Sequence, residues 1–348
     1  MPLTKVQSRG TENVGQGSSN VIINGAMKVA QRSTSETGLG ASSGYFTLDR
    51  FKMVCNNTAG RFTMSQDSSA PDGFGNSLKL ACTTADTSIA SNEEFGILYR
   101  MEGQDLQHLK KGTSSAYSTT LSFYVKGNAS ATYVAELMDG DNSSRHVGAT
   151  FNVTTDWTRV AITFPADTTG TLDDDANASL DLQFFLHAGS NNTSGTLQTS
   201  WGALAQANRA VGISSFFDST DRTFFITGIQ FEVGSQASDF QHEAFERTLH
   251  KCYRYYYRES LGGLGIGSSY ATNAWNYMSM ITPATMRADP TASYSGGTGS
   301  GTWHSTATTK GVSAKKGRLT VYQKCNGANL DIYVGGSDPL IPILDAEL

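Results

Sequence analysis

Ten short strand-like runs fill the chain between residues 51 and 233, and turn-forming Gly, Asn, Asp and Ser separate them. Within the runs, apolar residues either alternate with polar ones or stand together, as in strands buried on one or both faces. The runs cover residues 51–54, 61–65, 77–82, 96–101, 118–126, 132–138, 146–153, 158–164, 179–187 and 223–233. Strands at this spacing predict two antiparallel sheets packed face to face, because an α/β fold would need helical segments between them.

The composition agrees with a fold that is mainly β. Of the 348 residues, 36 are glycine, 16% are charged and 38% are hydrophobic. This balance suits extended structure with many polar loops. The formal net charge is −5, so we expect no general binding to nucleic acid, which needs concentrated positive charge.

The sequence also limits location and redox chemistry. It has no apolar segment of the signal-peptide kind near its start and no 18 consecutive apolar residues, so we expect cytoplasmic synthesis and no membrane insertion. No C-x-x-C pair occurs, so we expect reduced, buried thiols rather than a zinc site or a disulfide scaffold. The four cysteines are Cys55, Cys82, Cys252 and Cys325.

Residues 227–258 join the end of a strand to a helix. In the run 224–233, Gln230 and Glu232 stand on one face and apolar residues on the other, the pattern of a half-buried strand. The second face carries Phe225, Thr227, Ile229, Phe231 and Val233.

A helix is predicted to follow this strand. Ser238 and Gln241 stand at the spacing of a capping box, and glycines at 262–263 would end the helix. Four residues recur at helical spacing: Phe245, Leu249, Cys252 and Tyr256. We expect an aromatic face to pack between domains or subunits, and it comprises Phe245, Leu249, Tyr253, Tyr256 and Tyr257.

The same junction resembles one that is common in phage tail-fibre and related virion proteins. Their pattern is a strand reading roughly Gln-x-Glu-x-Gly, a turn of small residues, Phe-Gln-His, and a helix ending in Cys-x-Arg-Tyr-Tyr. The matching residues are Gln230, Glu232, Gly234, Phe240, Gln241, His242, Cys252, Arg254, Tyr255 and Tyr256.

Further strings resemble the same proteins, so the resemblance extends over nearly the whole chain, although it is loose between the strings. An opening string is followed by an Asp-Arg-aromatic triplet, with phenylalanine where tryptophan is commoner. A Pro-x-x-Met-Arg-x-x-Pro string and the ending Asp-Ala-Glu-Leu complete the set. The residues are Asn24, Gly25, Ala26, Met27, Gln31, Arg32, Asp49, Arg50, Phe51, Pro283, Met286, Arg287, Pro290 and 345–348.

The predicted fold is mainly β, with a jelly-roll β-sandwich, one α-helix and a smaller C-terminal β-domain. Residues 121–127 and 156–165 look like the paired strands of jelly-roll carbohydrate-binding modules. We therefore predict that the chain has four parts: a virion-attachment arm at 1–19, the jelly roll at 20–239, a linker helix at 240–262 and a β tip domain at 263–348.

The resemblance implies a phage virion structural protein, a short tail fibre or receptor-binding protein located in the tail rather than on the capsid. It would attach to other virion proteins through its N-terminal arm, form a homotrimer and recognise host cell-surface glycan. Three alternatives stay open: a capsid decoration or head-fibre protein, a glycan-degrading tail spike, and a free carbohydrate-binding module of a cellular protein.

Aromatic residues among polar neighbours are the candidate glycan-binding residues, because sugars stack their apolar C–H faces on flat rings. One lies in a long polar loop at 189–219, and the others lie in the C-terminal domain. For each of them, packing within a sheet or a trimer core is the alternative. The candidates are Trp201, Tyr270, Trp275, Tyr277, Tyr294 and Trp303.

We expect neither an enzyme nor a cofactor, since no G-x-S-x-G, H-E-x-x-H, P-loop or complete EF-hand sequence occurs. Asp139 and Asp141 are weak candidates for a calcium site. The same carboxylates, with those at 173–175, could instead serve glycoside hydrolysis or form a solvated turn.

Overall fold

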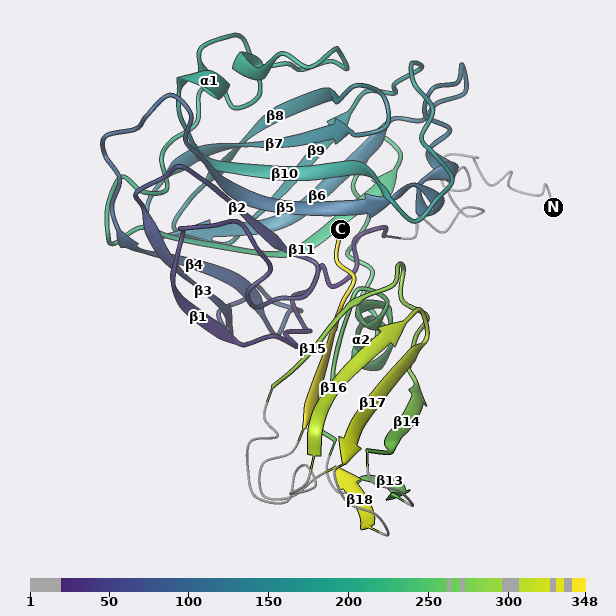
Figure 1. Ribbon diagram of the computed structural model, residues 1–348. Coiled ribbons are helices and arrows are strands. Elements are labelled where there is room, and N and C mark those ends of the chain that lie inside the picture. Colours follow the sequence, from purple (N-terminus) through teal and green to yellow (C-terminus); the bar gives the residue numbers. More distant parts are fainter. Residues whose placement is uncertain (1–19, 262–263, 270–272, 296–306, 326–329, 335–339) are drawn as a thin grey trace, which may run out of the picture.

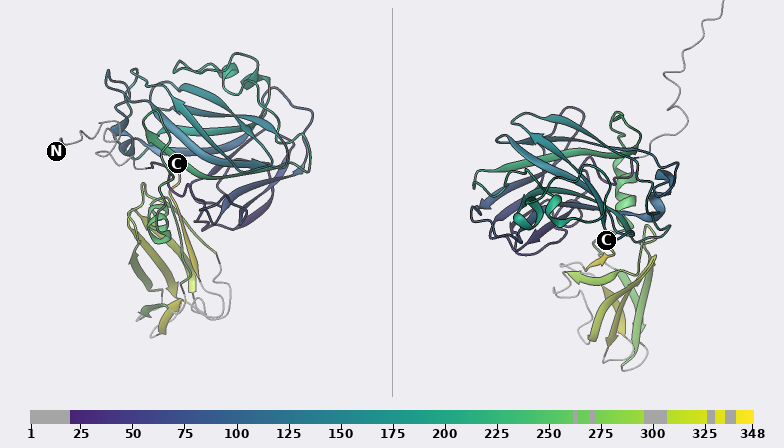
Figure 2. Two further views of the ribbon diagram at one scale, coloured as in Figure 1. Left: turned by 180° about the vertical axis from the view of Figure 1, so that it is seen from behind. Right: turned by 90° about the horizontal axis from the view of Figure 1, so that it is seen from above.

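The computed structural model describes residues 20–261, 264–269, 273–295, 307–325, 330–334 and 340–348 (Figure 1). The predicted arm at 1–19 therefore lies outside the described residues. Two β-rich units are visible, with helix α2 (Phe245–Tyr253) between them in the chain (Figures 1 and 2). Among the described residues, no helix has the length and apolar character that a bilayer span requires.

The larger unit is a sandwich of two antiparallel sheets. The six-stranded sheet has the order β1-β3-β4-β11-β6-β9, and the five-stranded sheet has the order β2-β5-β10-β7-β8. These strands are β1 (Ser35–Leu39), β2 (Lys52–Asn56), β3 (Arg61–Asp67), β4 (Ser77–Thr84), β5 (Glu94–Glu102), β6 (Thr119–Gly127), β7 (Ala131–Asp139), β8 (Arg145–Val153), β9 (Thr158–Phe164), β10 (Ala178–Ala188) and β11 (Thr223–Val233). The predicted jelly-roll β-sandwich is confirmed.

One hydrophobic core lies between the two sheets. Alternate residues of each strand point inward, because successive side chains in a strand face opposite sides of its sheet. Phe123 of β6 meets Phe151 of β8 and Phe184 of β10 edge to face, with ring centroids 5.1 and 5.2 Å apart. The aromatic contacts therefore join the two sheets directly.

The alternation predicted for β11 is wrong at one point. A bulge between Thr227 and Gln230 shifts the register against β6, and Gly228 there has φ +62°, a conformation that glycine adopts easily. As a result Ile226 and Ile229, three positions apart, both enter the core.

The face of β11 that carries Gln230 and Glu232 is buried, although a half-buried strand was predicted. Gln230 and Glu232 are 0% and 2% exposed, because the segment after the strand folds back over them. The Gln230 side-chain oxygen accepts a hydrogen bond from the Gln241 amide at 2.9 Å, and Glu232 accepts one from the Ser238 hydroxyl at 2.7 Å. These strand carboxamide and carboxylate groups thus hold the turn that leads to α2.

The same contacts correct the predicted helix start and end. The Ser238 hydroxyl donates its hydrogen bond to Glu232 and does not cap a helix. Helix α2 begins only at Phe245, with Ala244 as its N-cap and no side-chain cap. The helix ends at Tyr253, and Tyr256–Arg258 forms strand β12, which pairs with the last strand. Long-range strand pairing therefore overrides the helical spacing of Tyr256.

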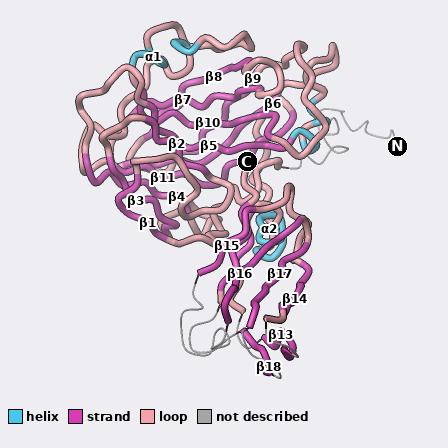
Figure 3. The backbone as a smooth tube through the Cα atoms, in the orientation of Figure 1, coloured by secondary structure: helices cyan, strands magenta, loops and turns pink. Residues whose placement is uncertain are grey.

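The smaller C-terminal β-domain is also confirmed. It contains three short sheets with the orders β12-β19-β15, β13-β18 and β14-β17-β16, and α2 packs at the end nearest the sandwich (Figures 1 and 3). The remaining strands are β13 (Leu264–Ser269), β14 (Trp275–Ile281), β15 (Thr291–Ser295), β16 (Ala307–Lys315), β17 (Arg318–Cys325), β18 (Leu330–Val334) and β19 (Ile341–Asp345).

The long loop after β10 covers the outer face of the five-stranded sheet. It contains α1 (Ser190–Thr193) and the 3-10 turn η4 (Gln206–Asn208); two other 3-10 turns, η2 (Gly103–Asp105) and η3 (Gln107–Leu109), follow β5. Arg209 of the loop donates to Glu136 of β7 at 2.6 Å, and both side chains are buried. Ala210 packs there against Val134 and Phe185.

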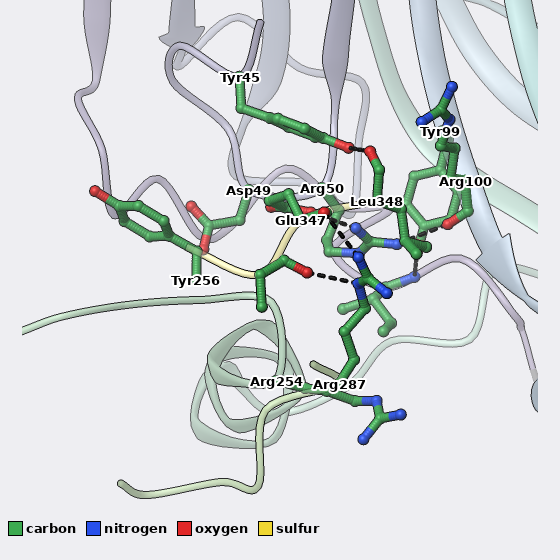
Figure 4. Close-up of polar contacts among 12 residues, drawn as sticks. Tyr45, Asp49, Arg50, Tyr99, Arg100, Arg254, Tyr256, Arg287, Glu347 and Leu348 are labelled. Carbon is green, nitrogen blue, oxygen red and sulfur yellow. Dashed lines mark hydrogen bonds and ion pairs between the residues drawn. The ribbon is translucent and has the colours of Figure 1, made fainter. Parts of the chain in front are cut away.

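The segment after β19 ties the two units together. Figure 4 shows Glu347 beneath the sandwich, where it forms an ion pair with Arg50, and Tyr45 donates a hydrogen bond to the Leu348 oxygen at 2.9 Å. From the C-terminal unit, Arg287 donates to the Ala346 carbonyl at 2.6 Å. One short segment therefore contacts residues of both units.

Candidate functional site

The sheet β14-β17-β16 presents one open face. Leu319, Val321 and Gln323 of β17 are at most 1% exposed, so they point into the domain, and the alternate residues of β17 point outward. Residues directly opposite one another on paired strands share a face. The outward pairs of β14 and β17 are Trp275 with Lys324, Tyr277 with Tyr322, Ser279 with Thr320 and Ile281 with Arg318.

Three aromatic rings form a platform at one end of this face. Trp275 and Tyr277 are 44% and 59% exposed, and their rings lie within 17° of parallel with centroids 6.0 Å apart. Tyr322 on the neighbouring strand is tilted, with its centroid 6.0 Å from that of Trp275. We refer to Trp275, Tyr277 and Tyr322 as the aromatic platform.

A glycine sets the position of the third ring. Gly311 of β16 lies opposite Tyr322, and a Cβ at this glycine would come within 2.6 Å of the Tyr322 hydroxyl oxygen and 2.8 Å of Cζ. The tyrosine ring therefore leans over β16 at a point where any other residue would displace it.

Polar groups surround the platform. The hydroxyl groups of Ser279 and Thr320 lie 2.9 Å apart, and the Lys324 ammonium lies 5.8 Å from the centre of the Trp275 ring. Flat rings beside hydroxyl and ammonium donors suit a sugar, which offers an apolar face for stacking and hydroxyl groups for hydrogen bonds.

The structure brings only some of the predicted aromatic candidates to this face. Tyr294 is 37% exposed on β15, in a different sheet. Trp201 belongs to the sandwich, where it packs against the core and its Nε1 donates to the Pro165 carbonyl at 2.9 Å. Tyr270 and Trp303 lie outside the described residues.

The structure packs some of the predicted interface residues against other parts of the chain and leaves Phe245 exposed. Tyr256 is 5% exposed and lies under Arg32, whose guanidinium carbon is 3.7 Å from the ring centre. Tyr253 and Tyr257 meet edge to face at 5.3 Å and pack on the core of the C-terminal domain. Leu249 is half-buried, whereas Phe245 is 48% exposed.

Tyr255, in the same aromatic run, contacts the sandwich through Arg50. Tyr255 is 1% exposed, and the guanidinium carbon of Arg50 lies 3.5 Å from its ring centre. Burial raises the pKa of the Tyr255 hydroxyl well above its usual range, although the Arg50 charge opposes the shift. Arg50 and Tyr255 belong to two separate strings that resemble the phage proteins. No local spacing in the sequence indicates that these two residues meet.

The two calcium candidates have other partners. Asp139 is buried and forms an ion pair with Lys111, whose ammonium also lies 3.1 Å from Asp167. Asp141 accepts a hydrogen bond from the Asp173 amide at 2.9 Å. Asp139 therefore already has a cationic partner within the chain.

A second group of metal-ligand types was not predicted. Ligand atoms of Asp86, Glu93 and His187 lie within 4.8 Å of one another, and all three residues are buried. His187 contacts Glu93 through Nε2 and Ser215 through Nδ1, both at 2.8 Å, while Asp86 accepts a hydrogen bond from the Ala59 amide at 2.7 Å. These contacts satisfy the polar atoms as a buried network.

Comparisons with known proteins give only distant likenesses. No family model matches the chain, and no curated protein matches it. Among solved structures, a putative sugar binding protein from Bacteroides thetaiotaomicron is 12% identical with a TM-score of 0.34, covering 62% of this chain and all of that one, 100%. The carbohydrate-binding module TmCBM61 is 10% identical with a TM-score of 0.30, covering 62% and 99%.

The tailspike protein 4 domain of bacteriophage CBA120 is also similar, at 10% identity and a TM-score of 0.31. The match covers 62% of this chain but only 21% of that domain, so the chain spans about a fifth of its length. Likenesses this distant show nothing about the activity of this chain.

Proposed function

We propose that this protein is a phage virion structural protein that binds host cell-surface glycan non-covalently through the aromatic platform. The observation that supports glycan binding is the exposure of Trp275 and Tyr277, two parallel rings, on an open sheet face. Burying large rings is favourable, and exposed aromatic groups of this kind mark binding surfaces.

The virion role is supported by the ordered strings that resemble phage tail-fibre proteins. In this proposal the arm at 1–19 attaches to other virion proteins, the jelly roll forms the body, and the C-terminal domain meets the host. The assembled form is a homotrimer in the tail. Arg50, Arg254 and Glu347, which belong to the matching strings, all take part in the junction between the two units, so the strings have a shared structural role.

Affinity electrophoresis tests glycan binding directly. Purified full chain is run in gels that contain surface polysaccharide extracted from the host bacterium, and we expect the polysaccharide to retard it. The double variant Trp275→Ala/Tyr277→Ala should migrate freely. Phe245→Ala is the matched control, because Phe245 is also an exposed aromatic residue but lies on α2, and this variant should be retarded like the wild type.

Three further measurements separate the alternatives. Antibody labelling of virions in the electron microscope should mark the tail, and label on capsid faces would favour a decoration protein. Release of reducing ends from the polysaccharide would favour a glycan-degrading tail spike. A monomeric mass by light scattering would contradict the homotrimer and favour a free carbohydrate-binding module.

A further inference from the structure

We infer that the glycan bound by the aromatic platform is an extended chain of several sugars, which continues from the platform to a second contact region at the far end of β14. We refer to Ser279, Ile281, Arg318 and Thr320 as the distal subsite. This inference rests on the proposed function and adds the length of the ligand and the direction in which it lies. It depends on which side chains share the face, on their exposure and on their spacing.

The distal subsite lies on the same side of the sheet as the platform. The two platform residues of β14 are followed at the next alternate positions by Ser279 and Ile281, and alternate residues of a strand face the same side. Their partners on β17 are Thr320 and Arg318, which share this side. Figure 1 shows β14, β17 and β16 side by side. One continuous strip of outward side chains therefore runs along β14 and β17.

The strip is longer than a single sugar. Trp275 and Ile281 stand at the two ends of β14, six positions apart, which corresponds to about 20 Å at the rise of a strand. A single sugar ring stacked on Trp275 cannot reach Ile281. A chain of several linked sugars laid along the strand contacts both.

Exposed apolar side chains are concentrated on this strip. Among the described residues, the two most exposed large hydrophobic side chains are Ile281, at 86%, and Tyr277, at 59%, and Trp275 adds another at 44%. All three are outward residues of β14. Single exposed apolar residues are ordinary on a protein surface, whereas several in line mark a binding surface. The exposure therefore favours a ligand that covers the whole strip.

The distal subsite offers both kinds of contact that a sugar uses. The apolar side chain of Ile281 is open to the C–H face of a sugar ring. Arg318 is also exposed, and its planar guanidinium carries N–H donors for hydroxyl oxygens. The hydroxyl groups of Ser279 and Thr320 lie 2.9 Å apart, and the one that accepts this hydrogen bond keeps its own proton to donate to a ligand.

Binding should therefore depend on the length of the glycan. The host surface polysaccharide that retards the wild type is partially hydrolysed, its fragments are separated by length, and their dissociation constants are measured by isothermal titration calorimetry. From the shortest fragment that binds to fragments that cover the strip, the dissociation constant should fall by at least about tenfold, which corresponds to one or two net hydrogen bonds. Further lengthening should change it little.

A variant of the distal subsite shows where the additional sugars bind. Ile281→Ser/Arg318→Gln should weaken binding of the long fragments about tenfold, as the loss of one or two net contacts would, and leave the shortest binding fragment unaffected. Trp275→Ala/Tyr277→Ala should abolish binding at every length. Ile89→Ser is the matched control, because Ile89 is an isoleucine of the sandwich that is 44% exposed, and it should bind like the wild type.

Dissociation constants that are independent of fragment length would overturn this inference and leave glycan binding by the platform intact. A gain with length that the distal variant does not reduce would place the additional contacts elsewhere and overturn the distal subsite. An equal loss for the shortest and longest fragments in that variant would also contradict an extended ligand. Failure of the wild type to bind the fragments and the intact polysaccharide would overturn both this inference and the proposed function.

Discussion

Arg50 and Glu347 form a buried ion pair across 297 positions of sequence, with 1% and 3% of their side chains exposed. The Arg50 guanidinium also donates to the Arg100 carbonyl at 2.6 Å and lies on the Tyr255 ring. The pair therefore joins the sandwich, the segment after α2 and the segment after β19 at one point (Figure 4).

We predict that Arg50→Met destabilises the protein by about 3–5 kcal/mol, because among the described residues it leaves the buried Glu347 carboxylate with Arg32, at 3.5 Å, as its one ion-pair partner. The double variant Arg50→Met/Glu347→Leu should recover part of this loss, since it removes both charges. Urea denaturation of the single and double variants gives the coupling energy. The exposed pair of Lys315 and Asp289 is the control, and the same double cycle there should give almost no coupling. Equal coupling at both pairs would contradict the prediction.

Asp49 should make the stability depend on pH. Burial raises the pKa of Asp49 to about 6 from an ordinary 3.8, although hydrogen bonds from Gln31 oppose the shift. The folded state thus binds a proton more tightly than the unfolded state, so this contribution is fully present below pH 3.8 and is lost as the pH rises through 6.

In the variant Asp49→Asn this titration is absent. Between about pH 4 and pH 7.5 the wild type should lose about 3 kcal/mol of unfolding free energy relative to the variant, at roughly 1.4 kcal/mol per pKa unit. Urea titrations of both proteins at several pH values measure the difference in unfolding free energy. The contributions of the other titrating groups cancel in this difference, because both proteins contain them. A difference that does not change with pH would show that Asp49 titrates normally.

Gly311 should affect glycan binding more than stability. In Gly311→Val, the Tyr322 hydroxyl end must move, because the new Cβ would come within 2.6 Å of it. Valine suits a strand, so the melting temperature should change little, whereas affinity for the host polysaccharide should fall about tenfold as the platform loses one ring. Gly75→Val is the control and should bind normally, because Gly75 belongs to the sandwich and an added Cβ there meets nothing within 4 Å. Normal binding by Gly311→Val would show that Tyr322 is not part of the site.

The period of the apolar residues was enough to predict the sandwich, because burial on one or both faces of each strand is encoded locally. The same period was not enough to predict the bulge at Gly228, since a change of register depends on the partner strand. The helix extent failed for the same reason: Tyr256 pairs with Asp345, almost ninety residues away, and no local pattern contains that contact.

The candidate site was predicted in part. Trp275 and Tyr277 alternate along one strand, so their common face follows from the sequence. Tyr322 and Arg318 join them only through the pairing of β14 with β17, which local spacing does not specify. The alternation of Arg318, Thr320, Tyr322 and Lys324 was nevertheless visible as a polar face opposite Leu319 and Val321.

Gly228 should be intolerant of substitution for two separable reasons. Its φ of +62° costs an L-residue about 1–2 kcal/mol, and a Cβ there would lie 2.7 Å from the Phe74 ring. Gly212→Ala is the matched control, because Gly212 has φ +82° with nothing within 4 Å of the added carbon. We expect Gly228→Ala to lose more unfolding free energy than Gly212→Ala in urea titrations. Equal losses would mean that Phe74 moves aside without cost.

The thiols should report on opening of the junction. Cys55, Cys82 and Cys252 are buried and free, and burial raises the pKa of Cys55 to about 12 and that of Cys82 to about 11. Since the thiolate is the reactive form, all three should resist iodoacetamide near pH 8 in the folded protein and react in urea. The fourth cysteine, Cys325, is replaced by serine for this measurement.

Cys252 lies on α2 next to the junction, and burial raises the pKa of its thiol well above the usual value. In Arg50→Met we expect Cys252 to react in the absence of urea, before Cys55 and Cys82, because loss of the ion pair loosens the contact of α2 with the sandwich while the sandwich core stays intact. Mass spectrometry of the labelled peptides identifies each site. Simultaneous labelling of all three thiols would instead show that the two units open together, and protection of Cys252 would show that the ion pair does not hold the junction closed.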